Sequence, residues 1–225
     1  MKKIILIFFC LSLIAGYAQK TKVEKPNYKK IEKKISKVGS DFYYPTLMER
    51  FNSGDTTMTL EQKRCLYYGF IYQSSYSPYI NSDYFDSIGV VLEKEELVVS
   101  DYEKIIVFSD SVLKENPFDL KTLNYVLYCY DYLENSEMVE KTLVKFKTII
   151  DAIYSSGTGE SLKKPYYVIF VSHEYVIINI LGYKAKGQSL IGTCDYLEVA
   201  KNKDNVKGVY FDVSPSLNYL ENMFK

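Results

Sequence analysis

The sequence has no tryptophan and only one histidine, His173. It also lacks a Cys-x-x-Cys pair and a His-x-x-x-His motif, so it carries no zinc signature and we expect no metal site. We expect no cofactor either, because the stretch 156–161 follows a predicted helix and has Glu160 where a phosphate-binding loop has lysine. A serine or cysteine nucleophile would depend on the single histidine, so the sequence identifies no catalytic residue.

Long hydrophobic runs are also missing after residue 18. No later segment reaches the ~18 continuous apolar residues of a membrane-spanning helix, so we expect a mature chain that is not transmembrane. Residues 1–18 begin with two lysines near the start, continue with a short apolar run and end on small residues. This pattern is typical of a signal peptide, here cleaved after Ala18. Cys10 lies inside the apolar run, so we expect export to the periplasm or the medium without lipidation.

The sequence has no overall excess of charge. Its 28 basic and 28 acidic residues give a formal net charge of zero, which predicts no nucleic-acid partner. Residues 19–40, however, carry eight lysines and two glutamates. This composition predicts a solvent-exposed basic leader, helical from Tyr28 to Val38, that could be weakly attracted to an anionic surface. Residues 41–225 carry a net charge of −8 and are expected to form a single domain.

Cysteine is scarce after the signal, with Cys65, Cys129 and Cys194 remaining. An exported protein can form disulfides, but an odd number of cysteines leaves it open whether any two of them are bridged. Cys65 and Cys129 lie in apolar helical patterns, which favours small buried side chains.

Residues 41–156 are predicted to be mainly helical. A capping box from Thr59 to Gln62 starts one helix, and another runs from about Ser100 to Asn116 before Pro117. Asp119 is predicted to cap the next helix, and a third helix follows. These helices give residues 101–154 a weak resemblance to a tetratricopeptide-type helical hairpin, which is too short to form a solenoid.

Residues 165–225 are predicted to be mainly β-structure. The hydrophobic period changes from 3.6 to 2 after Pro165, and the connections are too short for parallel crossovers. We therefore expect an antiparallel sheet and a final helix after Ser214, in an α+β fold with helices first. The expected strands are 166–171, 175–181, 190–191, 195–199 and 208–213.

Several motifs resemble those of the domain-of-unknown-function 4919 family. They extend over the chain from about Tyr43 to Lys225. The resemblance implies a secreted or periplasmic protein of Bacteroidota-type bacteria, and because the family has no assigned activity it supplies no catalytic residues. The motifs are Tyr44-Pro45-x-Leu47-Met48-x-Arg50-Phe51, Gly54-Asp55-Thr56-Thr57-x-Thr59-Leu60, Leu66-Tyr67-Tyr68-Gly69, Tyr76-Ser77-Pro78-Tyr79, Ile153-x-Ser155-Ser156-Gly157-x-Gly159, His173-Glu174-Tyr175, Cys194-Asp195 and Val209-Tyr210-Phe211-Asp212.

Only two of the 28 basic residues are arginines, and both lie close to a tyrosine-rich segment. Tyrosine supplies rigid area with a polar tip, and arginine supplies a planar fork for carboxylate or phosphate. The segment is thus a candidate ligand-contacting patch, although the chain has 23 tyrosines and these could equally form the core, with the arginines bonded to Asp55 or to helix ends. The candidates are Arg50, Arg64, Tyr67, Tyr68, Tyr76 and Tyr79.

Two functions remain open from the sequence. The first is a non-enzymatic exported binding or scaffold domain of the bacterial envelope that recognises a protein, a peptide or a glycan. The second is an envelope-polymer hydrolase that uses His173 and Glu174 as base and orienter. The competing interpretation of His173 is a surface residue in a hairpin turn.

Overall fold

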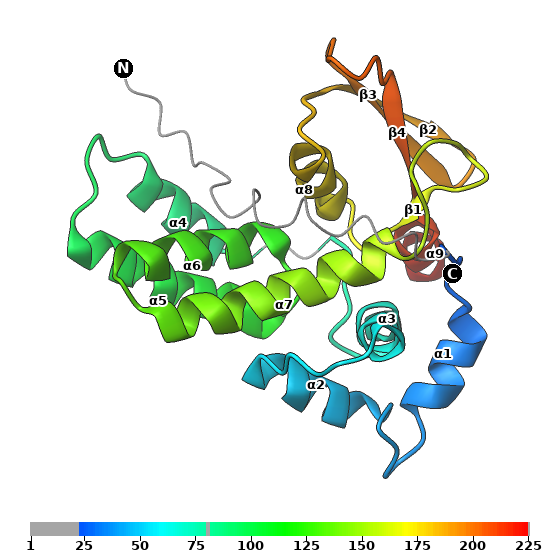
Figure 1. The fold of residues 1–225 in the computed structure, drawn as a ribbon, viewed down its shortest axis with the longest axis horizontal. Coiled ribbons are helices and arrows are strands. Elements are labelled where there is room, and N and C mark those ends of the chain that lie inside the picture. The colour runs from blue at the N-terminus through cyan, green and yellow to red at the C-terminus, as the bar shows by residue number, and fades with distance from the viewer. Residues whose placement is uncertain (1–22, 80–81, 225) are drawn as a thin grey trace.

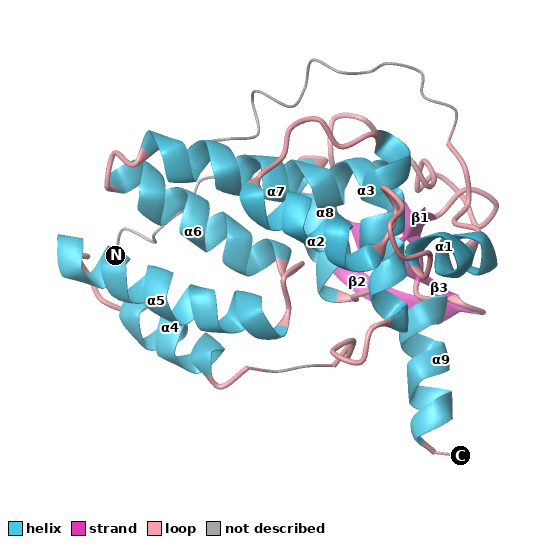
Figure 2. Ribbon diagram, turned by 90° about the horizontal axis from the view of Figure 1, so that it is seen from below, coloured by secondary structure: helices cyan, strands magenta, loops and turns pink. Residues whose placement is uncertain are grey.

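The computed structural model describes residues 23–79 and 82–224, so the predicted signal peptide and its cleavage site lie outside the described residues. Helices α1 to α7 come first, and a four-stranded sheet follows together with α8 and α9 (Figure 1). The α+β fold predicted from the sequence is therefore confirmed. In the view from below, the helical layer extends to one side of the sheet and α9 projects from the other end (Figure 2).

Among the N-terminal helices, α3 begins at the predicted capping box. Thr59 Oγ1 accepts from the Gln62 backbone N–H at 3.2 Å, and Gln62 Oε1 accepts from the Thr59 N–H at 2.9 Å. This reciprocal pair satisfies two donors that would otherwise be left open at the start of the helix. The elements of this part are α1 (Tyr28–Ile35), α2 (Tyr44–Ser53), α3 (Leu60–Gly69) and a 3₁₀ turn (Phe70–Tyr72).

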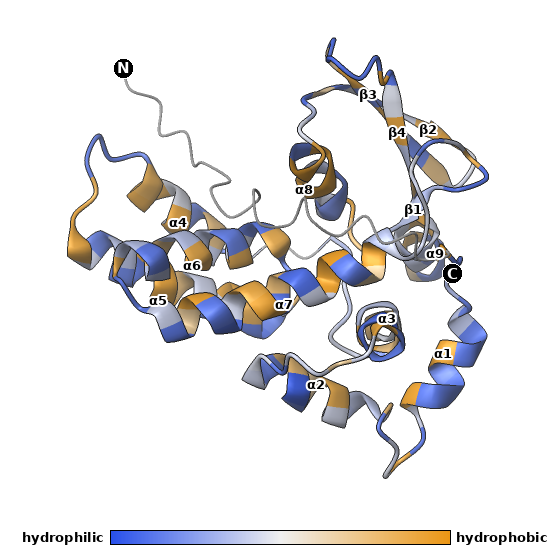
Figure 3. Cartoon of the chain, in the orientation of Figure 1, coloured by the Kyte–Doolittle hydropathy of each residue, from blue (hydrophilic) through white to orange (hydrophobic). Residues whose placement is uncertain are grey.

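Helix α1 lies within the segment that was expected to be a solvent-exposed leader. Most of its residues are hydrophilic (Figure 3), but Ile31 and Ile35 are buried four residues apart and belong to the main core. A Cβ atom on Gly69 of α3 would lie 3.0 Å from Ile35 Cδ1, so the glycine permits the close approach of these two helices. The expectation of a solvated arm is wrong for α1, because lysines occupy only the outer face of an amphipathic helix.

Helices α4 to α7 form the middle of the chain. They are joined by short turns, and α7 runs from the outer helices to the sheet (Figure 1). A small core lies between α4, α5 and α6, whereas α7 also contributes to the main core with α2, α3, α8 and the sheet. The bounds are α4 (Tyr84–Leu92), α5 (Val99–Glu115), α6 (Leu120–Tyr132) and α7 (Ser136–Tyr154).

The sheet has the strand order β1-β4-β3-β2. Strands β2 to β4 pair antiparallel as predicted, but β1 pairs parallel with β4, with Tyr166 opposite Phe211. A long connection through α8, β2 and β3 makes this parallel pair possible. The strands are β1 (Tyr166–Tyr167), β2 (Ala185–Ile191), β3 (Cys194–Val199) and β4 (Gly208–Asp212), and α9 (Ser214–Met223) follows.

The predicted strand at 175–181 is wrong, because this segment belongs to helix α8 (Ser172–Ile180). The predicted strand at 166–171 is confirmed only for its first two residues. Short β-branched runs that are buried do not distinguish strand from helix by period alone. The four-residue spacing of the buried pairs His173 with Ile177 and Glu174 with Ile178 is the helical signal that the alternating interpretation missed.

Candidate functional site

Three of the predicted site tyrosines form a buried group, which we call the tyrosine cluster: Tyr67, Tyr68 and Tyr76. Tyr67 and Tyr68 are fully buried and Tyr76 is 7% exposed. Their hydroxyls bond to the chain in β1 and just after it: Tyr68 donates to Tyr167 O at 3.1 Å, Tyr76 donates to Ile169 O at 2.8 Å, and Tyr67 accepts from the Ile169 N–H at 3.2 Å. The tyrosine cluster thus satisfies the backbone of a buried extended segment, as core packing predicted.

The other three candidates have separate bonding partners, and the Arg64 guanidinium lies 5.7 Å from the centre of the Tyr68 ring. Arg50 Nε donates to Asp55 Oδ2 at 2.6 Å, and bonds from Thr57 and Arg50 lower the pKa of Asp55 to about 2. Arg64 ties the N-terminal segment to the end of α7, donating to Ser155 Oγ at 2.6 Å and to Glu24 O at 2.7 Å. Tyr79 is 48% exposed on the loop before α4. The six residues therefore do not surround one cavity in the described part of the chain.

His173 is fully buried on α8, and not on a surface turn as one interpretation held. Its Nε2 lies 2.9 Å from Phe118 O, which can only accept, so Nε2 carries the proton. Nδ1 then accepts from the Tyr67 hydroxyl at 2.7 Å. Burial lowers the pKa of His173 to about 3, so the ring is neutral. Both ring nitrogens are thus occupied by core groups.

Glu174, the next residue of α8, is also fully buried. Neither carboxyl oxygen accepts a hydrogen bond from a described residue. Burial, and then the neighbouring Asp195 carboxylate, raises the pKa of Glu174 to about 9, so it is a neutral acid whose proton can be donated to Asp195. Asp195 in turn accepts from Gln188 Nε2 at 2.7 Å, and Gln188 Oε1 accepts from the Tyr175 hydroxyl at 2.6 Å.

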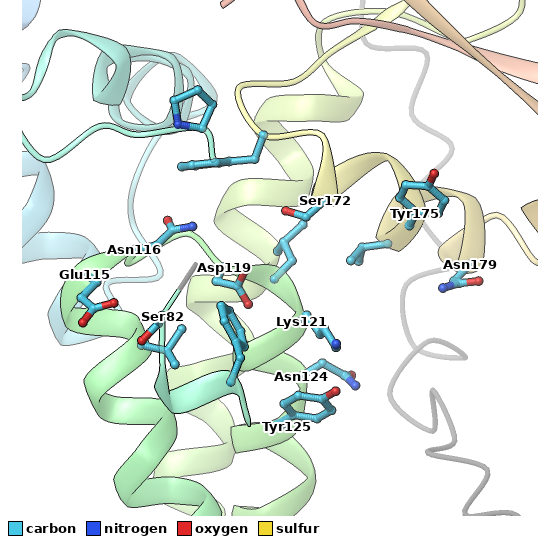
Figure 4. Close-up of a pocket in the computed structure, with 16 residues that line it drawn as sticks. Ser82, Glu115, Asn116, Asp119, Lys121, Asn124, Tyr125, Ser172, Tyr175 and Asn179 are labelled. Carbon is cyan, nitrogen blue, oxygen red and sulfur yellow. The ribbon is translucent and has the colours of Figure 1, made fainter. Parts of the chain in front are cut away.

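A cavity of about 680 Å³ lies on the other side of α8, against the turn that joins α5 and α6 (Figure 4). We call it the α6–α8 cavity. Three kinds of side chain line it: carboxamides and hydroxyls, a few charged groups, and apolar or aromatic walls. They are Pro78, Ser82, Phe85, Val112, Glu115, Asn116, Asp119, Leu120, Lys121, Asn124, Tyr125, Phe170, Ser172, Tyr175, Val176 and Asn179.

Some of these polar groups hold the walls in place. Asn116 Oδ1 accepts from Phe118 N–H at 3.1 Å, and Asp119 Oδ1 accepts from Thr122 N–H at 2.7 Å, which caps α6. The Asp119 cap was predicted from the sequence as the start of this helix. Because the bonds fix the turn between α5 and α6, one wall of the cavity is rigid.

Other polar groups of the α6–α8 cavity are uncommitted. Among residues 23–79 and 82–224, nothing forms a hydrogen bond with the side-chain amides of Asn124 or Asn179, which line the cavity from α6 and α8. The Lys121 ammonium lies 5.7 Å from the centre of the Tyr125 ring and has no carboxylate partner in the described part. Within the described part of the chain, these groups are therefore available to bind a ligand. Sequence reasoning missed all of them, and the Asp119 cap was the one local signal near the site.

The remaining sequence expectations concern cysteines and ligating groups. Cys65, Cys129 and Cys194 are buried free thiols, and burial raises the pKa of Cys65 to about 11 and of Cys129 to about 12. The described residues contain no group of three or more ligating side chains placed to hold a metal ion. In the stretch 156–161, which was compared with a phosphate-binding loop, Thr158 and Gly159 both donate their N–H groups to Lys164 O. No described helix is both long and apolar enough to cross a membrane.

Comparison with known proteins gives one match. No curated protein and no solved structure matches the chain. The model of a family described as a domain of unknown function, DUF4919, matches residues 29–222, which include every described element except the first residue of α1 and the end of α9. The resemblance noted in the sequence motifs is thus confirmed, and the chain belongs to the DUF4919 family.

Proposed function

We propose that this protein is an exported, non-enzymatic binding domain of the bacterial envelope and that the α6–α8 cavity is its ligand-binding site. The observation that carries the proposal is a cavity of about 680 Å³ that has one wall fixed by hydrogen bonds and, on both walls, carboxamides without a partner among the described residues. Sites for small ligands are typically ~300–1,000 Å³, largely preformed, and lined by apolar surface with a few placed polar groups.

The hydrolase alternative has no comparable support. His173 would have to give up its bonds to Tyr67 and Phe118 before it could act as a base. Glu174 is fully buried and neutral, and the cavity-lining residues include no imidazole. Binding by the α6–α8 cavity needs no such rearrangement.

Export is the second part of the proposal and rests on residues 1–18. It predicts that the chain, expressed with its own N-terminus in a diderm bacterium, is recovered outside the cytoplasm with Gln19 as its first residue. Cell fractionation and N-terminal sequencing measure this. Recovery of the intact chain in the cytoplasm would contradict it.

The binding site can be tested by filling it. Ser172 is the first residue of α8, is exposed and lines the α6–α8 cavity, so Ser172→Trp places an indole in the cavity at little cost in stability. Ser136 is the exposed first residue of α7 and lies away from the cavity, which makes Ser136→Trp the matched control. We expect a mixed panel of oligosaccharides and short peptides to contain a compound that raises the Tm of the wild type and of Ser136→Trp, but not of Ser172→Trp. Equal shifts in all three proteins would overturn the site.

A further inference from the structure

We infer that the ligand of the α6–α8 cavity is a short neutral glycan segment. This inference deepens the proposed function and rests on it. It is carried by three properties of the cavity: the type of its free polar groups, the aromatic residues in its walls, and the small net charge of its lining.

The free polar groups suit sugar hydroxyls. Each carboxamide offers one acceptor oxygen and two N–H donors, and a sugar hydroxyl both donates and accepts. Asn124 on α6 and Asn179 on α8 therefore present donor–acceptor pairs from two sides of the cavity (Figure 4). Two adjacent hydroxyls on a sugar ring can bond to both the oxygen and the N–H groups of one carboxamide. An ionised phosphate or carboxylate could bond only to the N–H groups of the carboxamide.

The aromatic walls suit the other face of a sugar. Tyr125 and Tyr175 come from opposite sides, and Phe85 and Phe170 add apolar surface. The face of an aromatic ring carries partial negative charge, which attracts the weakly positive C–H groups of a pyranose, and a tyrosine ring keeps a polar tip near water. A ligand with an apolar face and a polar edge fits this arrangement.

The charges of the lining disfavour an anionic ligand. Glu115 and Asp119 contribute two carboxylates, and Lys121 is the one cation among the lining residues. The carboxylates can accept charge-assisted bonds from neutral hydroxyls, which are stronger than bonds between neutral groups. A phosphate or a uronic acid would instead meet two like charges with a single ammonium to offset them.

The test compares three classes of probe by isothermal titration calorimetry on the purified full chain. The probes are neutral di- and trisaccharides of gluco, galacto, manno and xylo configuration, uronic-acid disaccharides, and terminally blocked tripeptides. Asn179→Ala removes one free carboxamide from the exposed surface of α8. Asn218→Ala removes an exposed asparagine from α9, away from the cavity, and serves as the control.

We expect a neutral saccharide to bind, Asn179→Ala to weaken it about tenfold, and Asn218→Ala to leave it unchanged. If only uronic acids or peptides bind, and Ser172→Trp blocks them, the glycan inference is overturned while the proposed function stands. If no probe binds, or if Ser172→Trp has no effect on binding, both are overturned.

Discussion

The polar side chains on the two faces of helix α8 differ in their burial and in their contacts within the protein. On the core face, His173 has both ring nitrogens bonded and Glu174 is held neutral beside Asp195. On the cavity face, Ser172 and Asn179 are exposed, and the amide of Asn179 is without a partner among the described residues. These residues are neighbours in sequence, and only the direction of each side chain separates them.

This difference shows why residue type alone misdirects a search for function. A single histidine next to a glutamate suggests a catalytic pair, yet here both side chains are buried in the core. Asparagine and serine are not usually taken as candidate site residues from sequence, yet here they are the exposed polar groups that line the cavity. Buried polar groups are nearly always hydrogen-bonded within the protein. A group that is already bonded in this way has little capacity left to bind a ligand.

The largest expected effect comes from breaking the core face at His173. The variant His173→Phe keeps an aromatic ring but removes the donor to the buried Phe118 carbonyl and the acceptor of the Tyr67 hydroxyl proton. The loss of these two buried bonds should lower the free energy of unfolding by about 3 kcal/mol. Urea denaturation at pH 7 measures this, and Tyr175→Phe on the cavity side is the control. A loss below about 0.5 kcal/mol, the usual size for a surface substitution, would show that the core bonds of His173 contribute little.

The next effect comes from the protonation of Glu174. Its folded pKa of about 9 lies above the ordinary value of a glutamate, so the folded state holds a proton that the unfolded state releases above about pH 4.5. The resulting stability is complete below that ordinary pKa, declines as pH rises, and is lost once pH passes the folded pKa. From pH 7 to 8 we expect the free energy of unfolding to fall by about 1 kcal/mol.

The control for this prediction is Glu174→Gln, whose neutral amide can still donate to Asp195. It should lack the decline that Glu174 causes between pH 7 and 8 and should be the more stable protein at pH 8. The comparison belongs above pH 7, because the lowered pKa of His173 makes stability fall with acid below about pH 6.5, in the opposite sense. Equal slopes in both proteins would mean that Glu174 is ionised in the folded state.

Much of the fold could be predicted from local signals. The capping box at Thr59, the period-3.6 helices and the final strands depend on residues close in sequence, so Thr59 and Asp119 mark true helix starts. Segment 166–181 could not be assigned in this way, because its apolar residues are buried on several sides and tertiary packing decides between strand and helix. The tyrosine cluster contributes to the outcome after β1, since the hydroxyls of Tyr76 and Tyr67 bond to the carbonyl and the N–H of Ile169.

The candidate site was less predictable. The sequence pointed to residues that are rare in the chain and charged, but the structure shows that Arg50 and Arg64 form hydrogen bonds within the protein. The α6–α8 cavity brings together residues 55 positions apart in the sequence, Asn124 and Asn179, and no local pattern marks which polar groups a fold leaves unbonded. The spacing of Ser172, Tyr175, Val176 and Asn179 on α8 is a helical stripe that becomes visible only once the segment is known to be a helix.

The smallest expected effect is on the cavity face and sharpens the comparison most. Asn179→Ala removes no bond to the described protein and exposes no new apolar cavity, so the free energy of unfolding should change by less than about 0.5 kcal/mol. Alanine also has the higher helix propensity, so a slight gain is the favoured sign. Urea denaturation beside Asn218→Ala measures it. A loss of about 2 kcal/mol or more would show that Asn179 is committed to the fold, and the contrast between the two faces of α8 would then fail.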